Sequence, residues 1–258
     1  MQAAVVNVLG QAPVFQSFPD PVAGAGEVEV KVRAAGLHPV VKAIASGAHY
    51  SAGGEVPAVP GIDGVGTLED GSRVYFGGVR KPWGTMAERA VVAGAMCIPL
   101  PDGIDDAQAA AIANPGMSAC VSLKNRAEVA AGETVLILGA TGVAGQLALQ
   151  AARLMGAKRV IGAGRNVGAI AQSGADAVIA LGEPEDAVRE AFAAEAAKGI
   201  DAGLSPKNFS LARRGRVRVA GQAAILAVAG MRCRTEGVEF RRPRRKSGKA
   251  EWRTIAAR

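Results

Sequence analysis

The sequence has few of the residues that build metal centres or disulfide frameworks. Its 258 residues include three cysteines, Cys97, Cys120 and Cys233, and two histidines, His38 and His49. The cysteines are far apart and form no C-x-x-C pair, whereas a structural zinc site needs four ligands, usually in closely spaced pairs. We therefore expect no metal site and interpret the cysteines as small apolar residues. A catalytic zinc held by Cys97, His38 and a carboxylate is a weaker alternative.

Long apolar segments are also absent, since no run of about 18 or more apolar residues occurs. The N-terminus lacks a basic region followed by an apolar block, which would mark a secretory signal. These absences predict a cytoplasmic protein without a membrane span. Aromatic residues are scarce at 4%, but 49% of the residues are hydrophobic. That content suffices for one large domain or two smaller ones.

Acidic residues become scarce near the C-terminus. The whole chain has a formal net charge of +7, yet residues 1–201 hold 15 basic and 20 acidic residues. Residues 202–258 hold 15 basic and only 3 acidic residues. The basic character therefore belongs to the last 57 residues, while the body of the chain is mildly acidic.

The first hundred residues have the pattern of a β-rich domain. In residues 27–33, Val28, Val30 and Val32 alternate with charged residues, as in a half-buried strand. Many short strands separated by glycine and proline turns are typical of a small β-barrel. The expected strands are 4–8, 27–33, 59–68, 71–76 and 84–92, and residues 37–47 are expected to form a short helix or turn.

The pattern then becomes helical, with an interruption expected at Asn114, Pro115 and Gly116. Beyond the central motif, Pro184 and neighbouring acids predict the start of a helix. The expected helices run from Asp105 or Asp106 to Ala113, and over 117–129, 169–173 and 183–198, with a strand over 176–181.

The most informative stretch is residues 134–165, which reads as strand, glycine-rich turn, helix and strand. The first strand is a short uncharged apolar run, typical of a buried parallel strand. Gly142 would let the backbone approach a pyrophosphate, and Gly145 would let the helix pack close to the sheet. The helix N–H groups and positive dipole end would face the phosphates. We predict a dinucleotide site at Gly139, Thr141, Gly142, Val143, Ala144 and Gly145; a purely structural turn is the alternative.

The end of the second strand predicts which coenzyme binds. An NAD site usually carries an acidic residue about 20 residues after the glycine motif. This chain has Arg165 and Asn166 there and no carboxylate. Because an arginine can pair bidentately with a 2′-phosphate, NADP(H) is favoured over NAD(H), and both residues join the predicted cofactor site. The alternative is that Arg165 is a solvated loop residue.

The order of these segments resembles the medium-chain dehydrogenase/reductase superfamily, specifically its zinc-independent quinone oxidoreductase-like branch. The resemblance covers about residues 1–201. It is carried by His38-Pro39, Gly47 with Tyr50, Pro60-Gly61-Ile62-Asp63-Gly64-Val65-Gly66, Gly84-Thr85-Met86-Ala87-Glu88, Asn114-Pro115-Gly116-Met117-Ser118-Ala119, Ala131-Gly132-Glu133-Thr134-Val135-Leu136-Ile137 and the Gly142/Gly145 turn.

The resemblance implies an α/β fold with two domains. A GroES-like β-barrel catalytic domain would span residues 1–112, and the first half of a Rossmann-type dinucleotide-binding domain would span residues 113–201. Zinc-dependent members of the family have a His-Glu pair after the glycine that Gly61 matches, whereas this chain has Ile62-Asp63. The resemblance therefore implies a reaction without zinc.

The implied reaction is hydride transfer from NADPH to a quinone or an activated enone or carbonyl. By match to the family's cleft segments, the residues expected near the nicotinamide are Tyr50, His38, Asn114 and Ser118. Tyr50 would donate a hydrogen bond or simply wall the pocket. His38 is more often a satisfied structural histidine, and Asp63 is expected to hold a turn.

The resemblance stops after Asp201, where we expect no apolar strand directly to follow. Charge reverses and periodicity is lost at this point, inside a sheet. We therefore interpret residues 202–258 as a basic non-matching tail, frame-shifted or otherwise aberrant, which would leave the Rossmann-type domain incomplete and impair activity.

Two rival interpretations give the chain another function. The basic tail can be taken as a module that binds nucleic acid or an acidic partner. The tail has one tryptophan, no zinc-ligand spacing and no recognisable motif order, and these features argue against nucleic acid as its partner. The other rival is a sensor that binds NADP(H) without turnover. The oligomeric state is left open, with a homodimer as the assembly considered.

Overall fold

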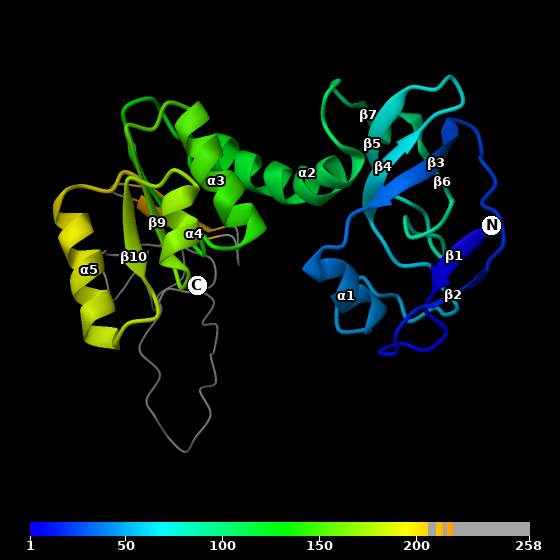
Figure 1. The fold of residues 1–258 in the computed structure, drawn as a ribbon, viewed down its shortest axis with the longest axis horizontal. Helices are drawn as coiled ribbons and strands as arrows, with labels where there is room; N and C mark the ends of the chain where they lie inside the picture. The colour runs from blue at the N-terminus through cyan, green and yellow to red at the C-terminus, as the bar shows by residue number, and fades with distance from the viewer. Residues whose placement is uncertain (206–209, 214–215, 219–258) are drawn as a thin grey trace, which may run out of the picture. The chain divides into compact units, whose positions relative to one another are not determined.

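The computed structural model describes residues 1–205, 210–213 and 216–218 (Figure 1). The chain divides into two compact units, Met1–Asn114 and a second unit that begins at Pro115. The division falls inside helix α2 (Asp106–Val121). Each unit has its own sheet and its own buried core.

The first unit is mostly antiparallel β-structure. Its main sheet has five strands in the order β6-β3-β4-β5-β7, and β1 and β2 form a separate two-stranded sheet. The alternating valines of β3 face the core, as predicted: Val30 is fully buried, and Val28 and Val32 pack against the same core cluster. The elements are β1 (Gln2–Val5), β2 (Val14–Ser17), β3 (Glu27–Ala35), α1 (Pro39–Ala45), β4 (Asp63–Thr67), β5 (Arg73–Gly77), β6 (Arg89–Ala93), η1 (Gly94–Met96) and β7 (Cys97–Pro99).

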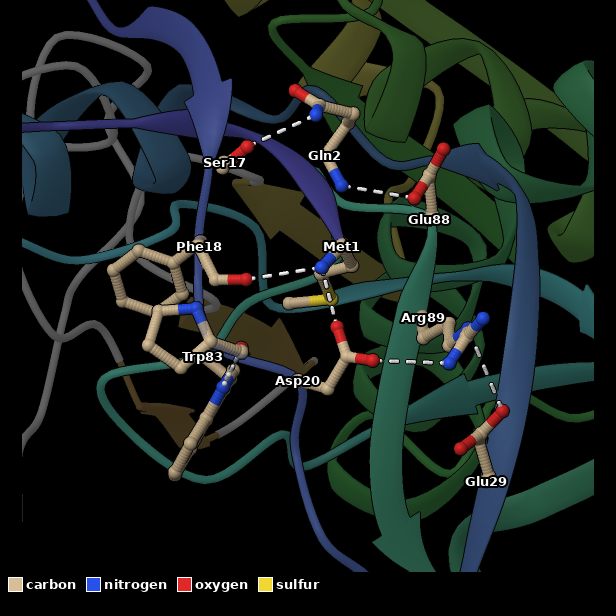
Figure 2. Close-up of polar contacts among 10 residues, drawn as sticks. Met1, Gln2, Ser17, Phe18, Asp20, Glu29, Trp83, Glu88 and Arg89 are labelled. Carbon is tan, nitrogen blue, oxygen red and sulfur yellow. Dashed lines mark hydrogen bonds and ion pairs between the residues drawn. The ribbon is translucent and has the colours of Figure 1, made fainter.

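Polar contacts join the β1–β2 hairpin to the region of β6 (Figure 2). The backbone N–H of Gln2 donates to the Glu88 carboxylate at 2.9 Å. Asp20, just after β2, pairs with the Met1 amine and with Arg89 of β6, the latter at 3.1 Å. These contacts align the hairpin against the larger sheet.

The second unit has a six-stranded sheet in the order β10-β9-β8-β11-β12-β13. The first four strands are parallel neighbours, and β12 and β13 extend the sheet in antiparallel fashion. The parallel strands follow the order of a doubly wound dinucleotide fold, with the first strand of the motif at the centre. The elements are η2 (Ser122–Arg126), β8 (Thr134–Leu138), α3 (Val143–Leu154), β9 (Arg159–Gly164), α4 (Val167–Gln172), β10 (Ala177–Ala180), α5 (Glu185–Ala197), β11 (Ala202–Ser205), β12 (Ser210–Arg213) and β13 (Arg216–Arg218).

Helices cover both faces of this sheet (Figure 1). On one face, Val135 and Ile137 of β8 share a core cluster with residues of α3 and with Ile170 of α4. On the other face, Leu136 and Leu138 share a cluster with Phe192 of α5. A strand buried on both faces has no polar side, which explains why β8 is an uninterrupted apolar run.

The expectation that no apolar strand follows Asp201 is wrong. Ala202–Ser205 forms β11, which pairs in parallel with β8, and both Ala202 and Leu204 are buried. Asp201 aligns the strand, because its carboxylate accepts the Thr134 N–H at 3.0 Å and its own N–H donates to the Thr134 carbonyl at 3.0 Å. Four residues with Leu204 as the one large apolar side chain have too little periodicity to show as a strand, and the pairing with β8 supplies the missing signal.

The basic tail lies mostly outside the described residues. Within it the structure describes the backbone of β12 and β13. Residues 206–209, 214–215 and 219–258 are outside, and Cys233 is among them. The interpretation of the tail as aberrant therefore stays a prediction.

The expected helix interruption at Asn114, Pro115 and Gly116 is also wrong. Helix α2 continues through Pro115 to Val121, so it includes the first five residues of the second helix expected over 117–129, and the π-helical η2 follows over Ser122–Arg126. Proline removes one helical hydrogen bond, yet an alanine-rich helix with buried Ala109, Ala110 and Ala119 retains its other bonds and its packing. α2 is 16 residues long, and none of the helices in the described part of the chain has the length and apolar character that crossing a bilayer requires.

Asp106 links the start of α2 to two strands, and its removal tests that link. Its carboxylate pairs with Arg33 of β3 and with Arg73 of β5, the latter at 2.6 Å. The hydrogen bonds from Arg33 and then Arg73 hold the pKa of Asp106 below its ordinary value of 3.8. We expect Asp106→Asn to lower the free energy of unfolding at neutral pH by about 1 kcal/mol, measured by chemical denaturation.

The pH dependence supplies the check on this prediction. A depressed folded-state pKa stabilises the protein above the unfolded value, and that stability is lost as pH falls through the folded pKa. The difference between wild type and Asp106→Asn should therefore shrink below pH 3.8. Glu69→Gln is the control, because Glu69 is exposed and has no hydrogen bond or ion pair to the described residues. A difference that is constant with pH would contradict the assignment.

Candidate functional site

The turn between β8 and α3 leaves a helix N-terminus without a side-chain cap. Gly139 follows β8 with φ of 69°, and the Gly142 N–H donates to the Gly139 carbonyl at 3.1 Å to close the turn. Gly142 is the N-cap of α3, no side chain accepts a capping hydrogen bond, and the first helical turn has no acidic residue. The N–H groups of that turn and the helix dipole therefore favour an anion from outside.

The two glycines of this turn serve different purposes. A Cβ at Gly145 would lie 2.3 Å from the Gly139 carbonyl oxygen and 2.7 Å from Ala140 Cα, so the turn and the helix pack too closely for a side chain. A Cβ at Gly142 would meet only the Gly139 oxygen, at an ordinary 3.6 Å. Gly142 has a φ of −78°, which any residue adopts. The missing side chain at Gly142 thus clears space on the outside of the protein, where a phosphate would approach.

The carboxyl end of β9 lies beside this turn. Gly164 ends β9, and a Cβ there would lie 3.0 Å from Thr141 Cγ2, so glycine permits the close approach. The Thr141 carbonyl accepts a hydrogen bond from Gln146 Nε2 at 3.0 Å, which fixes the turn against the helix. Val143 is exposed and Ala144 is half-buried at the helix start.

Arg165 is the first residue after β9 and is exposed. Its guanidinium has no hydrogen bond or ion pair to another residue in the described part of the chain. Asn166 is the N-cap of α4, and its side-chain oxygen accepts the Ala169 N–H at 3.1 Å. Arg165 is therefore available to an anionic ligand, whereas the Asn166 oxygen already has a partner.

A buried polar cluster lies in the first unit. The His38 Nε2 atom is 3.2 Å from Asp63 Oδ2, and the Tyr75 hydroxyl donates to the same oxygen at 2.7 Å. Burial, and then the hydrogen bond to Asp63, raise the pKa of the Tyr75 hydroxyl. The second Asp63 oxygen, Oδ1, is buried and has no hydrogen-bond partner among the residues that the structure describes. A Cβ at Gly36 would lie 2.5 Å from His38 Nε2, so the backbone at Gly36 confines the cluster.

The expectation that Asp63 holds a turn is wrong. Asp63 is the first residue of β4 and is 2% exposed. Tyr75, its partner on β5, was not singled out from the sequence. The available signal was the alternation in β5, which places Tyr75 on the face opposite to the buried Val74 and Phe76.

The four residues expected near the nicotinamide occupy different environments. Tyr50 is 96% exposed, and its ring lies 4.3 Å from that of His49. His38 is buried at the N-cap of α1, whereas Asn114 and Ser118 are half-buried on α2. Within the described ranges, no hydrogen bond joins any two of these four side chains. No group of three or more His, Cys, Asp or Glu side chains there is placed to hold a metal ion.

The first unit also contains a cavity of about 320 Å³, which the sequence analysis missed. Its walls come from the loop after β1, from α1 with the segment that connects it to β4, and from the segment between β5 and β6. Three segments far apart in the chain leave no local signal for such a cavity. The lining includes Ile44, Val56, Val59, Ile62, Val79 and Trp83.

Comparisons with known proteins connect this geometry to one family. No family model matches the chain. The quinone oxidoreductase of Sus scrofa is 38% identical over 148 residues, which cover 54% of this chain and 44% of that protein. The human quinone oxidoreductase is 35% identical over 171 residues, which cover 61% of this chain and 51% of that protein.

Solved structures extend the match to most of the chain. The quinone oxidoreductase of Thermus thermophilus, also solved with NADPH, aligns with a TM-score of 0.67 at 32% identity, covering 80% of this chain and 65% of that one. A "probable oxidoreductase" from Mycobacterium abscessus aligns with a TM-score of 0.67 at 31% identity, covering 78% and 67%. The chain belongs to the medium-chain dehydrogenase/reductase superfamily, in its quinone oxidoreductase-like branch.

Membership in this branch confirms the expected fold class, with GroES-like and Rossmann-type parts. This quinone oxidoreductase-like chain spans about half the length of the curated relatives that it matches. The site residues and the activity of this chain are proposals.

The contrast between Gly145 and Gly142 predicts different effects on stability. Gly145→Ala forces its Cβ against backbone atoms and should lower the free energy of unfolding by about 1–3 kcal/mol. Gly142→Ala, the matched variant three residues away, should cost less than about 1 kcal/mol, since only a weak preference at the N-cap is lost. Denaturant unfolding measures both, and equal losses would contradict the packing role of Gly145.

The two tyrosines give a second matched pair. Tyr75→Phe removes the donor to buried Asp63, whose other oxygen already lacks a partner, and should lower stability by about 1–3 kcal/mol. Tyr50→Phe should change it by less than about 0.5 kcal/mol, because Tyr50 is exposed. If Tyr75→Phe were as mild as Tyr50→Phe in denaturant unfolding, the hydrogen bond to Asp63 would contribute little.

Proposed function

We propose that this chain is an NADPH-dependent reductase that transfers hydride to a quinone or an activated enone or carbonyl. The proposal assigns coenzyme binding to the second unit and substrate binding to the first. It is supported by the open helix N-terminus at Gly142, by Arg165, and by relatives named quinone oxidoreductases, one of which was solved with NADPH.

The residues of the second unit fit a dinucleotide. The N–H groups at the start of α3 would hold the pyrophosphate over the space cleared by Gly142. Gly139, Thr141 and Gly145 shape the turn, and Val143 and Ala144 provide the first helical N–H groups. Asn166 would act through its amide nitrogen or simply by capping α4.

The proposal assigns the preference for NADPH over NADH to Arg165. It follows β9, where an NAD site usually has an acidic residue, and its exposed guanidinium has no partner among the described residues. A 2′-phosphate there would receive two parallel N–H···O bonds, which a ribose hydroxyl cannot match.

In the first unit, the cavity of about 320 Å³ is the proposed substrate site. Bound NADPH would supply the hydride, and the substrate carbonyl oxygen would gain negative charge as it is reduced. Hydrogen-bond donors near that oxygen would stabilise the charge, and a proton from solvent would complete the reduction. Tyr50, which directly precedes Ser51 of the cavity lining, is the proposed donor. His38, Asn114 and Ser118 are proposed to position the reactants from outside that lining.

The proposed reaction does not use zinc. Ile62 occupies the position at which zinc-dependent family members have a histidine, and its side chain offers no ligand atom. Asp63, which follows it, is engaged with His38 and Tyr75. The residues present therefore fit a reaction that relies on positioning and hydrogen bonding.

Substitution of Arg165 tests the coenzyme assignment. We expect Arg165→Ala to weaken NADPH binding by about 10- to 100-fold, the value of charge-assisted hydrogen bonds, with NADH binding unchanged. Titration monitored by coenzyme fluorescence measures both affinities. Arg126→Ala is the control, because Arg126 is exposed on η2, without a hydrogen bond or ion pair to the described residues, and precedes β8.

Two further measurements complete this test. Gly142→Ala should weaken the binding of both coenzymes, because its methyl group enters the space proposed for the pyrophosphate. Turnover is measured as loss of NADPH absorbance with duroquinone as substrate. An NADPH-to-NADH preference that is the same before and after Arg165→Ala would overturn the assignment of Arg165.

A further inference from the structure

Trp83 belongs to the wall of the cavity, and Figure 2 shows the hydrogen bond of its indole. Its indole N–H donates to the Pro19 carbonyl at 3.0 Å, and the guanidinium carbon of Arg80 lies 5.6 Å from its ring centroid. The ring is partly buried and packs against the core cluster that contains Phe18 and Val59. Both the indole edge and one flank are therefore fixed by the protein itself.

The chain around Trp83 is tied to another segment that lines the cavity. The Lys81 ammonium donates to the backbone carbonyls of Ser51 and Ala52, the latter at 2.9 Å. The Val59 N–H donates to the Pro82 carbonyl at 2.9 Å. These bonds cross between the two loop segments that line the cavity, so the cavity is formed before any ligand arrives.

The chemical character of the lining indicates the kind of ligand. The side chains are mostly apolar, and the charged residues in the lining are Glu55 and Lys81. Glu55 is exposed, and the Lys81 ammonium already has two carbonyl partners. A charged group on the ligand would lose its hydration against this mostly apolar lining, and that cost favours an uncharged ligand.

We propose that Trp83 is a specificity-determining residue and that its indole packs against the ring of an uncharged, planar substrate. The proposal rests on the reductase function proposed above and specifies its substrate class. The cavity volume is near the lower end of the roughly 300–1,000 Å³ of ligand pockets, which favours one ring or two fused rings. Trp83 contributes to this size limit, because moving its ring would break the hydrogen bond to Pro19.

Intrinsic fluorescence tests this directly. The chain has two tryptophans, so Trp252→Phe leaves Trp83 as the sole emitter. This variant is titrated with duroquinone without coenzyme; its ring carbons are fully substituted, so it does not add to cysteine. We expect saturable quenching, with N-acetyltryptophanamide as the control for collisional quenching. Anthraquinone sulfonate, which is charged and larger, should quench only as in the control. Quenching by duroquinone that never exceeds the control would overturn the proposal.

Steady-state kinetics adds a readout of specificity. In Trp83→Ala, the KM for duroquinone should rise about tenfold from the loss of aromatic contact, while kcat and the affinity for NADPH are kept. The rate with phenanthrenequinone, a three-ring substrate, should rise relative to duroquinone. Trp83→Phe should restore part of the duroquinone KM. An unchanged ratio between the two quinones in both variants would overturn the role in size selection.

The two proposals fail in different ways. Saturable quenching of Trp83 without NADPH oxidation by any quinone would support the pocket and overturn the reductase function. NADPH oxidation with quenching no greater than the control would support the reductase function and overturn the pocket. Because the fluorescence experiment retains the native Trp83, its result does not depend on whether the Trp83 variants fold.

Discussion

The pairing of β8 with a parallel strand on each side is the interaction on which the second unit depends. β9 and β11 both align with it, and its side chains bury alternately against α3 and α5. With its neighbours in register, the carboxyl ends of β8 and β9 must meet at one edge. Backbone hydrogen bonding therefore brings the glycine turn and Arg165 to that edge.

Local pattern was sufficient where an element carries its own signal. β8, α3 and β9 were predicted because a charge-free run, a glycine turn and an amphipathic helix lie consecutively in the chain. β11 was missed because its burial depends on pairing with β8. The two strands are distant in sequence, since the hydrogen bond between Thr134 and Asp201 spans 67 residues. The break predicted at Pro115 was wrong because the packing of the alanines on either side outweighs one lost hydrogen bond. Propensity describes neighbours in sequence, and these features depend on neighbours in space.

The same distinction separates the predictable part of the candidate site from the rest. The dinucleotide turn is one contiguous motif, and the family resemblance was visible in the order of such motifs. The contact between His38 and Asp63 spans 25 residues, and that between Tyr75 and Asp63 spans 12. The cavity combines three segments, and nothing in any one of them marks Trp83 as a wall. Only the folded chain shows that its indole edge is anchored at Pro19.

The two glycines of the α3 turn differ in what would preserve them over evolutionary time. A side chain at Gly145 would clash with the backbone of its own turn, so every descendant that retains this fold must retain the glycine. No backbone atom in the described part of the chain excludes a side chain at Gly142, so only a bound ligand would select for glycine there. A lineage that gave up its coenzyme would therefore drift at Gly142 while Gly145 stayed constant. A comparison of these two positions in a related protein therefore indicates whether that protein still binds a nucleotide.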